Sequence, residues 1–214
     1  MALLPESERR IRGNHAHAGA ARRLAKADPV LRRIIASVGP CTLTRHPRHF
    51  VTLCDSIVSQ QLSSRVAEVI FERFEALYPK GRPTPQLVAA TPIPRLRTAG
   101  LSGQKARYLK ELARGFVSGR IQPHRFPRQS NEAIIETLTS VHGIGRWTAE
   151  MFLMFSLNRL DVLPVDDLGI KKAIRRWYGF KTLPAARTMR RIGRPWHPYE
   201  TIASWYLWRS LRLD

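Results

Sequence analysis

Apolar residues recur at three- and four-residue intervals along most of this chain, and this helical spacing constrains its fold more than any other feature. Val30, Ile34 and Val38 show it before the break at Gly39 and Pro40. The spacing returns in later segments, which glycine, proline and polar corners separate. No segment alternates apolar and polar residues as a strand would. We therefore expect an all-α fold.

The charge balance points to a polyanionic partner. The 214 residues include 36 lysines and arginines against 16 aspartates and glutamates, a formal net charge of +20. Nucleic acid or an anionic membrane surface would suit such a chain. No apolar run approaches the roughly 18–20 residues of a membrane span, and the first residues lack an apolar stretch of signal-peptide length. We expect an intracellular protein without a membrane partner, cytoplasmic and, in a bacterium, nucleoid-associated.

The cysteines argue against a metal centre. Cys41 and Cys54 are the two in the sequence, too few for a zinc site of the paired CxxC kind or a four-cysteine iron–sulfur site. We interpret both as small buried apolar residues, and we expect no bound metal.

The segment "SVHGIGRWTAEMF" has the pattern of two helices joined by a tight turn. Gly143 and Gly145 allow backbone conformations closed to other residues and a close approach of the main chain to a ligand. The second helix begins directly after the turn, so its unpaired N–H groups suit a phosphate. An ordinary helical hairpin is the alternative, which the net charge of +20 disfavours.

Asp166 and Asp167 stand side by side after the apolar "VLPV" and before a basic helix. An acidic residue at a helix start is usually a cap. We expect one of the two to be the cap and the other to point elsewhere. A free carboxylate on a positive surface would suit stabilisation of a cation during chemistry.

Aromatic and polar clusters complete the set of candidates. All five tryptophans lie in the last third of the chain, where they either form core or stack an extruded base. The polar corner "SQQLSS" contains Gln60, Gln61 and Leu62, which serve either as turn residues or as a wedge that fills the gap left by a flipped nucleotide. The sequence does not decide whether Gln61, Leu62 or Ser63 is the wedge.

Together these segments resemble the helix-hairpin-helix superfamily of DNA glycosylases, which has a Gly/Pro-rich loop and a catalytic aspartate. The resemblance is carried by "LTSVHGIGRWTAEMFLMFSL", "DVLPVDDLGIKKAI", "SIVSQQLSSRVA" and "RPWHPYETIASWYLW", and it extends from about Asp28 to about Arg209. The branch it resembles most is 3-methyladenine DNA glycosylase II, which removes alkylated bases.

The resemblance implies two helical lobes with the active cleft between them. One lobe would be residues 50–158, which contain the helix-hairpin-helix, and the other would combine residues 28–49 with 159–214. Residues 1–27 match nothing in the family that we can name. We expect them to form a basic N-terminal arm.

The resemblance also implies roles for single residues. Asp167 fits the frame of the family's catalytic aspartate, which leaves Asp166 as its neighbour or cap. The base pocket would contain Trp147, Met151, Trp205 and Tyr206, with Met151 at a position that can hold an aromatic residue in the alkylation branch. The DNA-binding residues would be Gln60, Gln61, Leu62, His142, Gly143, Ile144, Gly145, Arg146, Thr148 and Lys171.

These residues imply a monofunctional glycosylase. Family members that also cleave the DNA backbone have a lysine where this chain has Trp147, so no Schiff base can form there. We expect a monomer that flips alkylated bases such as 3-methyladenine and 7-methylguanine out of double-stranded DNA and hydrolyses the N-glycosidic bond. No cofactor is required, although a monovalent cation at the hairpin would be compatible with the motif.

Three alternatives stay open on the sequence. A non-catalytic helix-hairpin-helix module would need the hairpin and the charge but not Asp167. A glycosylase for oxidised or mismatched bases would differ in its pocket residues. A basic RNA-binding or ribosome-associated protein would leave the aspartate pair and the tryptophans unexplained.

Overall fold

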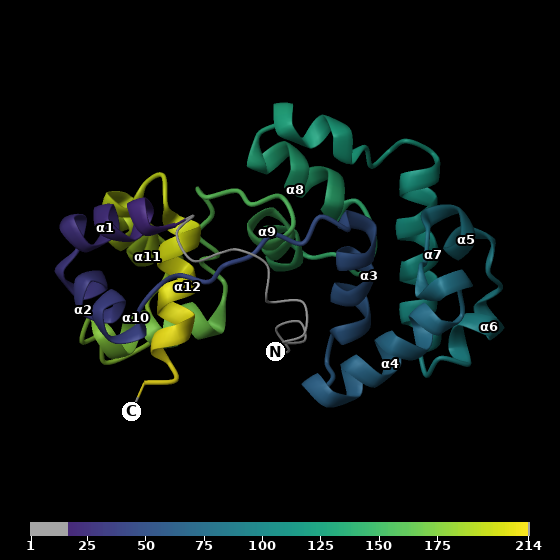
Figure 1. Ribbon diagram of the computed structural model, residues 1–214, viewed down its shortest axis with the longest axis horizontal. Coiled ribbons are helices and arrows are strands. Elements are labelled where there is room, and N and C mark those ends of the chain that lie inside the picture. Colours follow the sequence, from purple (N-terminus) through teal and green to yellow (C-terminus); the bar gives the residue numbers. More distant parts are fainter. Residues whose placement is uncertain (1–16, 214) are drawn as a thin grey trace. The chain divides into compact units, whose positions relative to one another are not determined.

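The computed structural model describes residues 17–213, and in that range it contains helices and loops but no β-strand (Figure 1). The all-α prediction is therefore confirmed for the described residues. They form two compact units. We call His46–Phe152 the hairpin unit, and residues 17–45 with 153–213 the terminal unit. The sequence analysis expected the central lobe to extend from residue 50 to residue 158, whereas the hairpin unit extends from His46 to Phe152.

The hairpin unit is a group of helices that includes the long helix α7. In chain order it contains α3 (His49–Ser59), α4 (Ser64–Ala76), α5 (Pro85–Ala90), α6 (Ile93–Arg97), α7 (Gly103–Val117), α8 (Asn131–Thr139) and the first part of α9 (Arg146–Phe155), with 3-10 turns at Pro79–Gly81 and Pro123–Arg128. α7 contacts α3, α5 and α6, and Figure 1 shows α5 and α6 beside it.

α7 shows how the sequence specifies these helices. Ser102 is its N-cap, and the Ser102 hydroxyl accepts the backbone N–H of Lys105 over 3.2 Å. Ala106, Leu109 and Ala113 are among its buried residues, and their spacing of three and four gives the helix one apolar face. The local sequence therefore accounts for both the start of α7 and the face that it buries.

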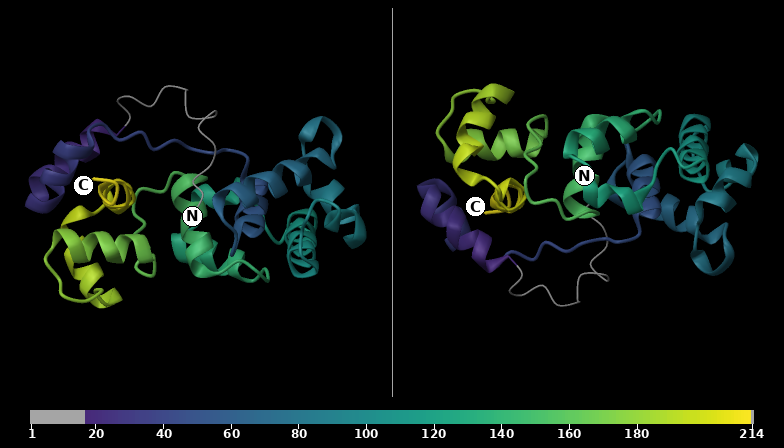
Figure 2. Two further views of the ribbon diagram at one scale, coloured as in Figure 1. Left: turned by 90° about the horizontal axis from the view of Figure 1, so that it is seen from below. Right: turned by 90° about the horizontal axis from the view of Figure 1, so that it is seen from above.

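The terminal unit brings together segments that are far apart in the sequence. It contains α1 (Ala18–Ala27), α2 (Pro29–Val38), α10 (Leu168–Trp177), α11 (Ala186–Gly193), α12 (Glu200–Ser210) and a 3-10 turn at Arg194–Trp196. α12 contacts α2 and α10, and both views in Figure 2 show the purple α1 and α2 beside the yellow α12. α12 is buried around most of its circumference, which makes it the core helix of this unit.

Asp28 joins the two segments of the terminal unit. Its Oδ1 accepts the backbone N–H groups of Val30 and Leu31, so Asp28 caps α2. Its Oδ2 accepts the Tyr178 hydroxyl over 2.6 Å and the Trp196 Nε1–H over 2.8 Å. Four hydrogen bonds therefore hold one buried carboxylate, and two of them come from residues at least 150 positions away.

Residues 18–27 were expected to be part of a basic N-terminal arm, and the structure shows a packed helix there instead. These residues form α1, whose Ala20, Ala21 and Leu24 are buried in the core of the terminal unit. The sequence did not reveal this helix as part of the core, because two of its three buried residues are alanines, which give only a weak apolar pattern among the arginines. Residues 1–16 of the predicted arm lie outside the described residues.

Both cysteines are buried and free, as the sequence predicted. No helix in residues 17–213 has both the length and the apolar character that crossing a membrane requires.

Asp55 on α3 is an acidic side chain in an apolar setting, and it makes the stability of the fold pH-dependent. Burial raises the pKa of Asp55 from 3.8 to about 6, and the nearby Glu75 and Glu68 add to the rise, although a hydrogen bond from the Ser59 hydroxyl opposes it. Because the folded-state pKa is above the unfolded one, folding disfavours the ionised form. Stability is therefore lost as the pH rises from about 4 through about 6.

We predict that Asp55→Asn will stabilise the protein at pH 8, by about 1–3 kcal/mol, since asparagine removes the buried charge and can still accept from Ser59. The advantage should shrink toward pH 4, where the Asp55 carboxyl is protonated in the folded protein. Urea unfolding of both proteins at the two pH values measures this. A variant that is less stable than the wild type at pH 8 would contradict the assignment.

Candidate functional site

The predicted hairpin is present between α8 and α9. The turn closes with a hydrogen bond from the Ile144 N–H to the Val141 carbonyl over 3.1 Å, and α9 begins directly after Gly145. Gly145 and Arg146 are exposed, whereas Ile144 is buried. The first N–H groups of α9 have no acceptor within the helix, and together with the helix dipole they favour an anion.

The two glycines of the turn serve different purposes. Gly143 has φ of 88°, which favours glycine, and a Cβ added there would lie 2.2 Å from Cδ2 of the Tyr108 ring. A Cβ on Gly145 would have no atom within 4 Å. Gly143 is therefore required by the fold, whereas the space beside Gly145 is open to a ligand.

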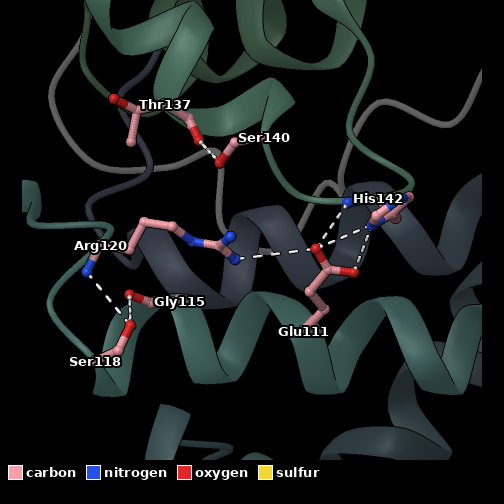
Figure 3. Close-up of polar contacts among 7 residues, drawn as sticks. All are labelled: Glu111, Gly115, Ser118, Arg120, Thr137, Ser140 and His142. Atoms are coloured by element: carbon pink, nitrogen blue, oxygen red, sulfur yellow. Dashed lines mark hydrogen bonds and ion pairs between the residues drawn. The ribbon is translucent and has the colours of Figure 1, made fainter.

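Side chains from α3 and α7 hold the hairpin in place. Gln60, which follows α3, donates from Nε2 to the Gly143 carbonyl over 2.6 Å. Glu111 on α7 accepts the His142 backbone N–H over 3.3 Å, and its second oxygen lies 2.9 Å from His142 Nδ1 (Figure 3). Figure 3 also shows Arg120 directed at the same carboxylate, 3.9 Å away. The backbone of the turn is thus fixed from two sides.

The polar corner between α3 and α4 is built around a left-handed residue. Gln61 has φ of 57° and is exposed, and Leu62 is half-buried. Lys105 on α7 donates from Nζ to the carbonyls of Val58 and Gln60, each over 2.7 Å, and so satisfies the last carbonyls of α3. Gln60 supports the hairpin through its amide, and Gln61, Leu62 and Ser63 stay the wedge candidates.

Arg146 and Thr148 begin α9. The Arg146 guanidinium forms ion pairs with Glu132 and Glu150, and the hydrogen bond to Glu132 raises the pKa of Arg146 further. The Thr148 side chain is buried. The DNA-binding role of both residues stays a prediction, to which their backbone N–H groups at the start of α9 could contribute.

Trp147 and Met151 lie on α9 in the hairpin unit, and Trp147 is the more exposed. Its exposed fraction is 36%. Met151 is partly buried. The buried residues of α9 are Thr148, Ala149, Glu150, Phe152, Leu153 and Met154. Trp147 is therefore exposed beside a buried stretch of the helix, which suits a role in binding.

The aspartate pair lies at the start of α10 in the terminal unit. Asp167 is the N-cap, its Oδ1 accepts the Ile170 N–H over 2.8 Å, and it is 4% exposed. Asp166 is exposed, with its Oδ1 3.6 Å from Lys171 Nζ. We expected the cap and the catalytic carboxylate to be different residues. Instead Asp167 is the cap, and Asp166 is its exposed neighbour.

A second hydrogen bond reaches Asp167 from α12. The Trp208 Nε1–H donates to Asp167 Oδ1 over 2.8 Å. The sequence offered Trp208 as a core residue or a base-stacking residue but not as a partner of Asp167, because their distance depends on how α10 and α12 pack. The contacts of Tyr108, Lys105 and Glu111 with the hairpin and its surroundings also depend on packing and were not predicted. For Glu111 the sequence does contain a signal, because it is the one acidic residue in the basic helix α7.

Trp205 and Tyr206 on α12 are both buried in the terminal unit. The Arg209 guanidinium lies over the Trp205 ring, 5.1 Å from its centroid. The Tyr206 ring is 1% exposed, and its hydroxyl donates to the Gly39 carbonyl over 3.1 Å. Burial also raises the pKa of Tyr206 to about 12. Tyr206 therefore packs in the core of the terminal unit, and its role in a base pocket stays a prediction.

Positive charge is concentrated after Asp167. Between Leu168 and Tyr199 the sequence has nine lysines and arginines and no acidic residue. On α11 the buried residues are Met189 and Gly193, whereas Arg187, Arg190 and Arg191 are exposed. This surface would attract a polyanion. No group of three or more potential metal-ligating side chains occurs within residues 17–213.

Residues 54–198 match the family model of the HhH-GPD superfamily base excision DNA repair proteins, and the chain belongs to that superfamily. DNA-3-methyladenine glycosylase 1 of Schizosaccharomyces pombe is 36% identical over 195 residues, which cover 89% of this chain and 86% of that protein. The alkylbase DNA glycosidase-like protein mag2 of the same yeast is 31% identical over 199 residues, with coverage of 91% and 93%. The resemblance found in the sequence is confirmed.

Two solved structures share the fold over nearly the whole chain. The Schizosaccharomyces pombe 3-methyladenine DNA glycosylase in complex with abasic DNA is 35% identical with a TM-score of 0.81, and the match covers 92% of this chain and 98% of that one. A DNA-3-methyladenine glycosidase from Bacillus halodurans is 34% identical with a TM-score of 0.84, with coverage of 95% and 94%.

We predict that Gly143→Ala will destabilise the protein by more than about 1 kcal/mol, since the change forces both a left-handed alanine and a displaced Tyr108 ring. Gly145→Ala is the matched control, expected to lie within about 0.5 kcal/mol of the wild type. Urea unfolding of the three proteins checks the pair. Equal stability of both variants would show that the turn is not held as described.

Proposed function

We propose that this protein is a monofunctional DNA glycosylase of base excision repair that removes alkylated bases, such as 3-methyladenine and 7-methylguanine, from duplex DNA. The observation that carries the proposal is the placement of Asp167. The reaction needs a carboxylate in a fixed position, and the nearly buried Asp167 carboxylate accepts hydrogen bonds from Ile170 N–H and Trp208 Nε1–H. The relatives of this chain described above are named as 3-methyladenine or alkylbase glycosylases. We further propose that it acts as a monomer on DNA inside the cell.

In the proposed reaction the hairpin binds the DNA backbone and Asp167 acts on the sugar. N–H groups at the start of α9 would hold a phosphate and set the register without reading sequence. Trp147, which is partly exposed, would stack against the flipped base, with Met151 on the same helix as a further candidate. Gln61, Leu62 or Ser63 would fill the gap in the duplex, and Lys171 would contact a phosphate near Asp167.

The chemistry is hydrolysis of the bond between the sugar C1′ and the base nitrogen. The alkylated base carries a positive charge, so it leaves with the bonding electron pair as a neutral molecule and needs little acid catalysis. Asp167 would stabilise the positive charge that develops on the sugar. It would also orient the water that attacks C1′ and accept its proton, which leaves an abasic site.

The reaction consumes water and needs no redox cofactor. A monovalent cation shared by hairpin carbonyls and a phosphate would fit the turn, although the Gly143 carbonyl already accepts from Gln60. Trp147 stands where a lysine would be needed for strand cleavage through a Schiff base. We therefore propose that the DNA strand stays intact after base release.

We predict that Asp167→Asn will reduce base release from methylated duplex DNA by at least about 100-fold, which is typical when a group that stabilises transition-state charge is removed. Asparagine is as good a helix cap as aspartate, so α10 should keep its structure. Asp166→Asn is the matched control, because Asp166 is exposed and not part of the proposed site, and it should release bases at nearly the wild-type rate.

Single-turnover base release by the three proteins, with DNA affinity measured in parallel, tests the assignment. Wild-type rates in Asp167→Asn would assign the chemistry to another group. Tight DNA binding by all three proteins without base release from any would instead support a non-catalytic DNA-binding module or a different lesion.

Binding to undamaged duplex DNA should weaken steeply with salt, because several phosphates are neutralised by lysine and arginine. We predict that the logarithm of the affinity will fall with the logarithm of the salt concentration with a slope of about −4 to −6. Gly145→Ala should bind more weakly than the wild type at every salt concentration, since its methyl group would crowd the phosphate. Fluorescence anisotropy measures both, and a flat salt dependence would argue against DNA as the partner.

A further inference from the structure

Trp208 contacts the proposed catalytic carboxylate directly, a role that the sequence did not indicate. Its Nε1–H and the Ile170 backbone N–H both donate to Asp167 Oδ1, each over 2.8 Å. One donor belongs to α10 and the other to α12, so packing of the terminal unit determines their convergence. Hydrogen bonds to an ionised acceptor are shorter and stronger than neutral ones, and two on one oxygen restrict rotation of the carboxylate.

The Trp208 ring is itself held in one orientation. Phe155, at the end of α9 and within the terminal unit, stacks against Trp208 with ring centroids 5.9 Å apart and planes inclined by 29°. A stacked aromatic pair of this kind restricts the direction in which the indole N–H points. The donor is therefore preorganised toward Asp167 by a residue that does not itself touch the carboxylate.

Gly169 makes the contact between Trp208 and Asp167 possible. A Cβ added to Gly169 would lie 3.0 Å from Asp167 Oδ1, 3.0 Å from Trp208 Cδ1 and 3.2 Å from Trp208 Nε1. The backbone of Gly169 is not left-handed, so the requirement is one of space and not of conformation. A methyl group at this position would require the indole or the carboxylate to move by a few tenths of an ångström.

We propose that Trp208 is a positioning residue for Asp167, and that Gly169 is needed because it leaves room for their hydrogen bond. The inference rests on the proposed function, in which the Asp167 carboxylate must face the sugar at a fixed distance. A group displaced by about 1 Å can lose on the order of 100-fold in rate. Trp208 would therefore affect the chemical step and leave DNA binding unchanged.

The kinetic test is Trp208→Phe, which keeps an aromatic ring to stack on Phe155 and removes the N–H. The single-turnover rate of base release should fall by about 10- to 100-fold, the effect expected for a hydrogen bond to a charged group. DNA affinity should stay within about twofold of the wild type. In the Asp167→Asn background the same change should cause no comparable further loss, because the carboxylate is already gone.

Trp177→Phe is the matched control. Trp177 Nε1 is buried and has no hydrogen-bond partner within the described part of the chain, so its loss should leave the rate unchanged. Gly169→Ala tests the same contact from the other side, and its rate should fall as well. An unchanged rate in both Trp208→Phe and Gly169→Ala would overturn the proposal, and so would an equal loss in Trp177→Phe.

The indole N–H signals in a nitrogen–proton NMR spectrum separate this proposal from the proposed function. The five tryptophans give five such signals, and the Trp208 signal is the one that Trp208→Phe removes. Asp167→Ala should move that signal, whereas Asp166→Ala should not. A signal unaffected by Asp167→Ala overturns the contact. If Asp167→Ala moves the Trp208 signal but the wild-type protein releases no base, the proposed function is contradicted and the contact is established.

Discussion

The buried carboxylate of Asp28 is the interaction on which the terminal unit depends. It accepts two backbone N–H groups from the start of α2 and one donor each from Tyr178 and Trp196. A carboxylate that lost these partners would be buried without compensation, which is costly. Without Asp28, residues 17–45 and residues 153–213 would lose the buried hydrogen bonds to Tyr178 and Trp196 that join them. The proposed catalytic Asp167 lies in this same unit.

Asp167 repeats the arrangement of Asp28 in the same unit. Each aspartate caps a helix and each accepts a tryptophan N–H from a distant segment. Both oxygens of Asp28 accept hydrogen bonds, from the backbone of α2 and from two side chains. The combination of a helix cap and a tryptophan N–H therefore fixes Asp28 at the start of α2 and the proposed catalytic Asp167 at the start of α10.

The sequence predicted the helices well because their apolar spacing and caps are local. Ser130 is the N-cap of α8, and α3 and α4 meet at the polar corner. The family was predicted from short motifs whose order is specific. The sequence was less informative where a residue's role depends on packing: residues 18–27 were taken for part of an arm but form α1, and Trp208 was not connected with Asp167. Contacts between residues 41 positions apart, as for Asp167 and Trp208, leave no periodic signal.

The most direct test of the account is identification of the products that the wild-type protein forms from methylated, end-labelled duplex DNA. The account predicts that mass spectrometry will detect free 3-methyladenine, and that the labelled strand will stay intact until alkali breaks it at the abasic site. Strand breaks without alkali would contradict the monofunctional mechanism. DNA that is bound tightly but loses no base, whatever alkylated lesion it carries, would contradict the account as a whole.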